Sequence, residues 1–291
     1  MTVIPREYEG KEMPESRSIV EVINDNIEDG NLNIPVFNSV ALRLQKVLAS
    51  QDYGIEEVNK LIIADPGLAS QVLRISNSSF YAGLNKVTTI REAIVRLGAS
   101  SVANIAMMST QQDIYRSSDP KLNEIMRTLW RHALCCAIGA KWLAAKTNFA
   151  SLKEEAFLAG LLHDIGKLFL LKVMEKIIKE GKQEGSISSA LVSEVMDNMH
   201  VEHGANLMRK WNMPETYCTV VRDHHAEQWD QGNAVLAIVR LVNQACRKLG
   251  VHMSPDPTLV LFACGEAQFL GIREITLAEL EIVIEDAMKL T

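Results

Sequence analysis

The chain has 291 residues, of which 47% are hydrophobic and 23% are charged. These values are typical of globular proteins and exclude collagen-like, low-complexity and disulfide-scaffold classes. Lys and Arg number 30 against 36 Asp and Glu, so the formal net charge is −6. This acidic balance argues against a broad nucleic-acid-binding surface, because such a surface needs clustered positive charge.

Targeting and membrane segments are not evident in the sequence. The first sixteen residues, MTVIPREYEGKEMPES, lack the apolar region of a signal peptide. No run of about 18 apolar residues is present to cross a membrane. The five cysteines include no CxxC pair, which favours a reducing compartment in which thiols pack as small apolar residues. We therefore expect a cytoplasmic protein that makes no membrane contact.

Helical periodicity runs through nearly the whole chain. Residues 1–18 are charged and aperiodic, and we expect a flexible arm there. From Ile19 onward, apolar residues recur at intervals of three and four, and strand-like alternation is scarce. Asp65 before Pro66 marks a helix start. Capping boxes are predicted at three further starts, namely Thr89 with Glu92, Ser151 with Glu154, and Thr276 with Glu279. The sequence predicts an all-α, two-lobed fold.

Two short polar segments divide this helical pattern. SSDP ends at Pro120 and SPDP ends at Pro257. We expect an amino-terminal helical lobe over residues 19–118, a helical bundle over 119–253, and terminal helices over 254–291 that pack on the bundle.

The first lobe contains two polar clusters, and the first of them admits both a structural and a ligand-binding interpretation. The side chains of the SNSS run either bind a ligand or end a helix, and capping is favoured because Ser and Asn prefer caps and turns. A solvated helix face is expected for the charged group that follows. The two clusters are Ser76, Asn77, Ser78 and Ser79, and Arg91, Glu92 and Arg96.

The candidate site is a set of histidines around His163 and Asp164. This pair stands in LLHDIGKL, inside the apolar window Ala156–Met174, which we interpret as one buried helix. Burying a carboxylate is costly unless it is paired, hydrogen-bonded or metal-bound. Each histidine alone is typical of a satisfied core residue, but the set favours a present or residual metal site. The candidate ligands are His132, His163, Asp164, His200, His224 and His225.

Imidazole and carboxylate ligands together suit a divalent transition metal, namely Fe, Mn, Zn or Ni. Such a metal polarises a phosphoryl oxygen. Asp164 could bridge two ions or hold one, and Lys167, one turn beyond His163, could reach a substrate phosphate. If the protein is an enzyme, Asp164 and Lys167 are therefore the expected catalytic residues. His203 and His252 are interpreted as surface or packing residues.

LLHDIGKL, with His132 upstream and a His-His pair downstream, resembles the HD superfamily of metal-dependent phosphohydrolases. The segments IADPGLASQVLRISNSSFYAGLNKVTTIREAIVRLGASSVANIAM and HVEHGANLMRKWNMPE resemble more closely the HDOD domain, an HD-related output domain of bacterial signalling proteins. The resemblance covers roughly residues 31–230. It implies a two-lobed helical fold and a histidine at position 200, four residues before a glycine.

Two departures from the HD pattern bear on activity. IVRLVNQA places Asn243 where HD phosphohydrolases generally have a further aspartate, and no Gly-Tyr-Pro motif follows His225. Losing that carboxylate would weaken metal binding or disable turnover. The favoured hypothesis is therefore a signalling output protein that acts through a partner protein or a nucleotide ligand and retains the metal site. The alternative is a metal-dependent phosphohydrolase acting on a nucleotide or phosphodiester. DNA binding is disfavoured, because no basic recognition helix is evident.

Overall fold

The structure is a computed structural model that describes residues 19–28, 39–50, 53–78, 81, 83, 85–181 and 188–289. The arm expected over residues 1–18 lies outside these ranges, as does Ser79. Within them the chain forms α-helices and two 3-10 helices, with no strand. The all-α prediction is confirmed.

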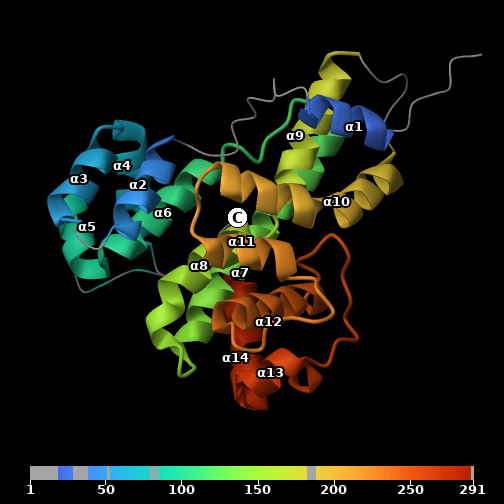
Figure 1. Cartoon of the computed structure of the whole chain (residues 1–291). Helices are drawn as coiled ribbons and strands as arrows, with labels where there is room; N and C mark the ends of the chain where they lie inside the picture. The colour runs from blue at the N-terminus through green and yellow to red at the C-terminus, as the bar shows by residue number, and fades with distance from the viewer. Residues whose placement is uncertain are drawn as a thin grey trace, which may run out of the picture.

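In the described part of the chain, six α-helices lie before Pro120 and the other helices begin at Pro120 or after it (Figure 1). The first six are α1 (Ile19–Glu28), α2 (Ser39–Ala49), α3 (Ile55–Ile63), α4 (Pro66–Ser76), α5 (Ile90–Leu97) and α6 (Ala99–Gln111). The middle part contains α7 (Pro120–Ala145), η1 (Ala150–Leu152), α8 (Lys153–Leu162), α9 (Ile165–Lys179) and α10 (Ser189–Lys210). The last part contains α11 (Glu215–Asp223), α12 (Ala234–Lys248), η2 (Leu261–Ala263), α13 (Gly265–Phe269) and α14 (Glu274–Met288).

Two apolar cores hold these helices together. The smaller core is shared by α2, α3, α4, α5 and α6, and it includes the buried side chains of Leu44, Ile62 and Val72. These helices form a group of their own in Figure 1. The larger core is centred on α7, which packs against α8, α9, α12 and α14. Ile23 of α1 belongs to the larger core, because α1 packs against α9 rather than against the first group. The division of the chain at residue 118 stays a prediction.

Some predicted helix starts are confirmed and two are wrong. The side chains of Asp65 and Thr89 cap α4 and α5. Glu154 makes no capping box with Ser151: its carboxylate instead accepts a hydrogen bond from Ser101 and pairs with Lys141. Helix α14 already begins at Glu274, so the box predicted at Thr276 and Glu279 lies inside the helix.

The polar clusters of the first lobe serve mainly structural purposes. Asn77 ends α4, and its side-chain amide donates to the carbonyl of Leu73 in the last turn, which favours the capping interpretation. The same side chain exchanges two hydrogen bonds with the backbone of Val87. Arg91 is exposed and pairs with Glu56. Arg96 departs from the predicted solvated face, because its guanidinium donates to the backbone oxygens of Ser76 and Asn85.

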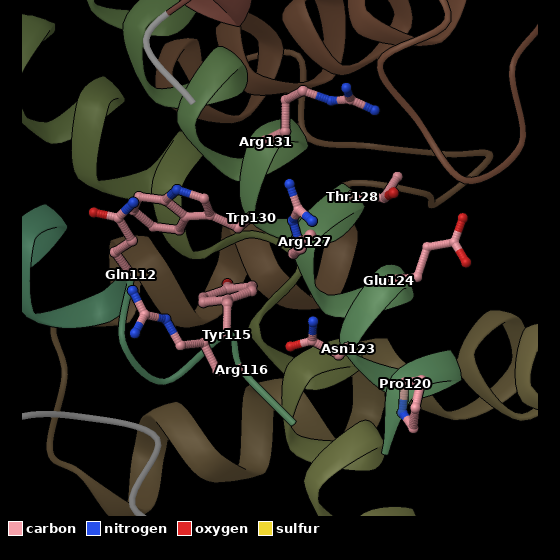
Figure 2. Close-up of a pocket in the computed structure, with 10 residues that line it drawn as sticks. All are labelled: Gln112, Tyr115, Arg116, Pro120, Asn123, Glu124, Arg127, Thr128, Trp130 and Arg131. Atoms are coloured by element: carbon pink, nitrogen blue, oxygen red, sulfur yellow. The ribbon is translucent and has the colours of Figure 1, made fainter. Parts of the chain in front are cut away.

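Buried thiols and a side cavity complete the architecture. Four of the five cysteines are buried, as expected for packing residues, and Cys264 is half-buried. No helix among the described residues is both long and apolar enough to span a membrane. A cavity of about 710 Å³ opens between the segment after α6 and the first half of α7 (Figure 2).

Candidate metal centre

The His163–Asp164 pair lies at a junction between two helices. The sequence predicted one helix over the window Ala156–Met174, and this prediction is wrong. Helix α8 ends at Leu162, His163 caps it, and Asp164 is the residue that precedes α9. The turn matters because neighbouring residues of a continuous helix point about 100° apart. With the chain turning here, both side chains contribute to one cluster.

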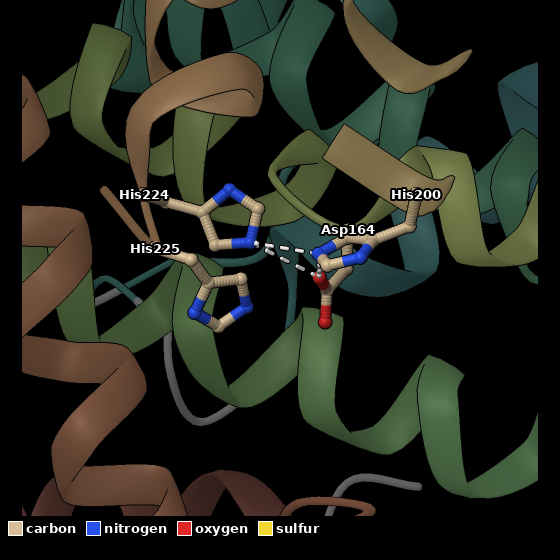
Figure 3. A group of neighbouring side chains, drawn as sticks. All are labelled: Asp164, His200, His224 and His225. Atoms are coloured by element: carbon tan, nitrogen blue, oxygen red, sulfur yellow. Dashed lines mark hydrogen bonds and ion pairs between the residues drawn. The ribbon is translucent and has the colours of Figure 1, made fainter. Parts of the chain in front are cut away.

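Three other elements bring the remaining histidines to this junction. His132 lies in the middle of α7, and His200 lies in α10. His224 ends α11, and His225 follows it (Figure 3). His132, His163, Asp164, His200 and His224 are between 0 and 3% exposed, whereas His225 is exposed. The structure therefore brings together all six residues that the sequence suggested as ligands.

Backbone carbonyls fix the orientation of the four buried imidazoles. A carbonyl oxygen only accepts, so each Nδ1 within reach of one carries the proton and donates it. The four bonds are from His132 to Val251 at 2.7 Å, from His163 to Gly160 at 2.8 Å, from His200 to Met196 at 2.6 Å, and from His224 to Val221 at 3.0 Å. This is the arrangement by which metal-binding histidines are generally held.

The four Nε2 atoms then converge on the carboxylate of Asp164. His200 and His224 lie 3.6 and 3.3 Å from Oδ1, and His132 and His163 both lie 3.5 Å from Oδ2. Oδ1 is buried and accepts no hydrogen bond from the described residues. With the protons on Nδ1, lone pairs on nitrogen face lone pairs on oxygen, and a cation between them would satisfy both. The donor set therefore fits a transition metal.

Lys167 places a positive charge next to the carboxylate of Asp164. Its ammonium lies 2.9 Å from Oδ2 of Asp164, and both side chains are buried. Burial acts to raise the pKa of Asp164, but the neighbouring Lys167 ammonium is the strongest opposing effect, and that pKa is held well below its usual value. Burial lowers the pKa of His224 to about 4, against the opposing effect of Asp164. At neutral pH the site thus consists of a carboxylate and neutral imidazoles.

Two further side chains border the cluster and were not predicted. His252, interpreted from the sequence as a surface or packing residue, is half-buried with its ring 4.9 Å from that of His132. Its Nδ1 lies 2.9 Å from the backbone nitrogen and 3.2 Å from the backbone oxygen of Ser254, so the loop after α12 holds the ring in place. The thiol of Cys136 lies 3.6 Å from Nε2 of His132. Nothing in the sequence around either residue signalled this proximity. His203 belongs to none of the groups of neighbouring side chains that could hold a metal, among the residues described.

Asn243 is buried on α12, which packs against α7 and α8. Its Oδ1 accepts no hydrogen bond from the described residues. A buried amide oxygen without a partner costs free energy. Asn243 thus contributes an unpartnered buried oxygen, as Asp164 does, and it lies on α12, which contacts two helices that border the cluster.

Comparison with known proteins identifies the family. The HDOD domain matches residues 34–227. An uncharacterized protein of Treponema pallidum (strain Nichols) is 27% identical over 227 residues, which make up 77% of this chain and 42% of that protein. The chain therefore spans less than half of the length of that relative.

Solved structures share the fold. An HDOD domain protein of unknown function from Geobacter sulfurreducens superposes with a TM-score of 0.73 at 21% identity, over 92% of this chain and 95% of that one. A protein from Shewanella amazonensis SB2B, provisionally named a metal-dependent phosphohydrolase, gives 0.69 at 17% identity, over 93% and 98%. Since the family match covers about two thirds of the sequence, this chain belongs to the HDOD domain family.

Proposed function

We propose that this chain is a regulatory output protein of bacterial signal transduction. It acts through a partner protein or a nucleotide ligand, and it holds a divalent transition metal in the histidine–aspartate cluster. One observation carries the proposal: the cluster has the donor set of a metal site, yet its five inner residues are at most 3% exposed. A phosphate ester must reach a catalytic metal, whereas a metal that fixes the arrangement of helices is best enclosed.

The metal would tie together four parts of the fold. Its ligands would come from α7, the α8–α9 junction, α10 and the end of α11, with His225 on the solvent side. The ligands that we assign are His132, His163, Asp164, His200, His224 and His225. A change in metal occupancy would alter how these helices pack and thereby the surface that a partner contacts. This is the link between the site and a regulatory output.

Two histidines one turn apart on α10 offer a matched test. His200 lies in the cluster, and His203 lies outside it with its ring near Phe169. Elemental analysis of protein purified without added metal or chelator should find about one or two equivalents of metal in the wild type and in His203→Gln. His200→Gln should lose metal. A wild type that stays free of metal even after incubation with Fe²⁺, Mn²⁺, Zn²⁺ and Ni²⁺ would contradict the metal site.

The regulatory assignment needs a separate measurement. Hydrogen exchange of metal-loaded and metal-free protein should differ in surface segments beyond the ligand-bearing helices. Metal-loaded protein should not hydrolyse nucleotides or bis(p-nitrophenyl) phosphate. Turnover of either substrate that His225→Gln abolishes would overturn the regulatory assignment.

One observation favours the second candidate, a metal-dependent phosphohydrolase. His225 is exposed, and its ligand nitrogen groups with those of His200 and His224 and a carboxylate oxygen of Asp164. A substrate phosphate could approach from this side, and a bound metal would act as a Lewis acid on it. Lys167 would then have to exchange its pairing with Asp164 for the phosphate. The hydrolysis assay above separates the two candidates.

A further inference from the structure

The cavity of about 710 Å³ lies beside the first half of α7 (Figure 2). Its walls come from the segment between Gln112 and Arg116 and from α7 between Pro120 and Arg131. None of the lining residues belongs to the metal centre. The volume falls in the range of about 300–1,000 Å³ that is usual for sites of small organic ligands.

The cavity is positively charged in an acidic protein. Three arginines line it, with Glu124 as the one acidic residue among the lining side chains described. Figure 2 shows that they come from two segments: Arg116 from the connection after α6, and Arg127 and Arg131 one turn apart on α7. This concentration of guanidinium groups contrasts with the net charge of −6 of the chain.

The guanidinium groups of the cavity have few partners among the described residues. Arg116 pairs weakly with Asp113 at 3.4 Å. Neither Arg127 nor Arg131 makes an ion pair with a described residue. The Nε of Arg131 is buried and lacks a hydrogen-bond partner in this part of the chain. Because a buried donor without an acceptor is costly, this group is suited to an acceptor supplied by a ligand.

Neutral donors and aromatic rings complete the lining. The Oδ1 of Asn123 accepts from the backbone N–H of Ser117, which orients its amide. The rings of Tyr115 and Trp130 pack 5.3 Å apart on one wall. Aromatic walls of this kind contact planar bases, and guanidinium groups bind phosphate oxygens in pairs.

We propose that this cavity binds a small ligand that carries several phosphate groups, either a nucleotide or an inorganic polyphosphate. Arg116, Arg127 and Arg131 would hold the phosphates. The proposal is independent of the metal centre. Ligand binding in the cavity could also act as the input signal of the protein. Arg131 directly precedes His132 on α7, so a shift of this helix on ligand binding would reach the metal centre.

Isothermal titration calorimetry of the full chain tests this with ATP, GTP, inorganic tripolyphosphate and adenosine. The first three should bind, and adenosine should not. Arg127→Gln should weaken the binding of all three by roughly tenfold, the usual worth of a charge-assisted hydrogen bond. Lys121→Gln, an exposed lysine on the same helix outside the cavity, is the matched control and should change it little. Metal content measured on the same samples should be equal in all variants.

Several outcomes are decisive. Nucleotides that bind more tightly than tripolyphosphate identify the ligand as a nucleotide, and equal affinities identify an inorganic polyphosphate. The proposal is overturned if none of the phosphate ligands binds at about 1 mM, a concentration that detects even weak sites. Equal losses in Arg127→Gln and Lys121→Gln overturn it as well, because they would indicate only general electrostatic attraction.

Discussion

Gly166 of α9 lies directly against the backbone oxygen of His200 on α10. A Cβ atom on Gly166 would fall well inside the contact distance of that oxygen, and one on Gly204 would come within 3.1 Å of the Gly166 nitrogen. The two helices therefore touch through their backbones at this point. Asp164 stands two residues before one glycine, and His200 stands four residues before the other. The contact thus sets the distance between the carboxylate and this imidazole.

This contact predicts that Gly166→Ala is strongly destabilising. Backbone atoms cannot move aside as a flexible side chain does, so overpacking here should cost at least the usual 1–3 kcal/mol or so. The variant should also lose metal, because α10 and His200 are pushed away from Asp164. Differential scanning fluorimetry and elemental analysis measure the two effects.

The control for this substitution is Gly54→Ala. Gly54 precedes α3, has a negative φ of −99°, and leaves open space where a Cβ would stand. Because Gly54 is the N-cap residue of α3, where Ala is less favourable than Gly, its substitution should cost about 0.5–1 kcal/mol and leave the metal content unchanged. A Gly166→Ala variant as stable as this control would show that α9 and α10 do not pack as described.

The sequence indicated the candidate ligands because the His-Asp pair of LLHDIGKL and the histidine of HVEHGANL are local patterns. It did not indicate the close packing of Gly166 and Gly204, which brings together two segments that are distant in the chain. The turn at His163 was missed because apolar residues continue through it on both sides. His252 was missed because it reaches the cluster from a loop after α12, where Gly250 has a φ of 75°. No periodicity describes such a loop.

Tertiary partners account for one of the two wrong capping boxes. Glu154 has the spacing of a capping residue, but Ser101 and Lys141 claim its carboxylate. Ser101 lies 53 residues away in the chain. A local pattern cannot report competition from such a distant donor.

Replacing Lys167 should make folding depend on metal. In Lys167→Met the buried Asp164 carboxylate loses its ammonium partner, and breaking a buried ion pair typically costs about 3–5 kcal/mol. A bound cation would take over this role, so added metal should raise Tm more in the variant than in the wild type. Thermal unfolding with and without Zn²⁺ measures this. Lys176→Met, on the same helix in a partly exposed pair with Glu180, should respond to Zn²⁺ as the wild type does. An equal response in Lys167→Met would mean that no cation replaces the ammonium.

The link between Glu175 and the start of α7 predicts a pH-dependent stability. Glu175 accepts hydrogen bonds from Ser117 and Ser118 and pairs with Lys172 and Lys179. Burial alone would raise its pKa, but these donors lower it to about 2. A carboxyl whose pKa is depressed by folding stabilises the protein above its unfolded pKa, and this contribution is lost as the pH falls towards 2.

Glu175→Gln should therefore lower the free energy of unfolding by up to about 3 kcal/mol at pH 7. The difference from the wild type should shrink between pH 5 and pH 2, the window set by the unfolded and folded pKa values. Urea unfolding at pH 7 and at pH 3 tests this. Glu279→Gln, an exposed residue of α14, should have little effect at either pH. A deficit in Glu175→Gln that is the same at both pH values would exclude the charge as its cause.

Asn243 offers a test of what the departure from the HD pattern costs. Its Oδ1 is buried without a partner, so a carboxylate at this position would be a poorly compensated charge in the absence of metal. Asn243→Asp should therefore lower Tm in metal-free protein. With metal bound, the added negative charge should stabilise the ion, so the variant should bind Mn²⁺ or Zn²⁺ more tightly than the wild type. Competition with a chromogenic chelator measures that affinity, and Asn243→Ala serves as the control without an oxygen ligand. If Asn243→Asp binds metal no better than Asn243→Ala, position 243 does not act on the metal centre, and the missing aspartate does not explain any lack of turnover.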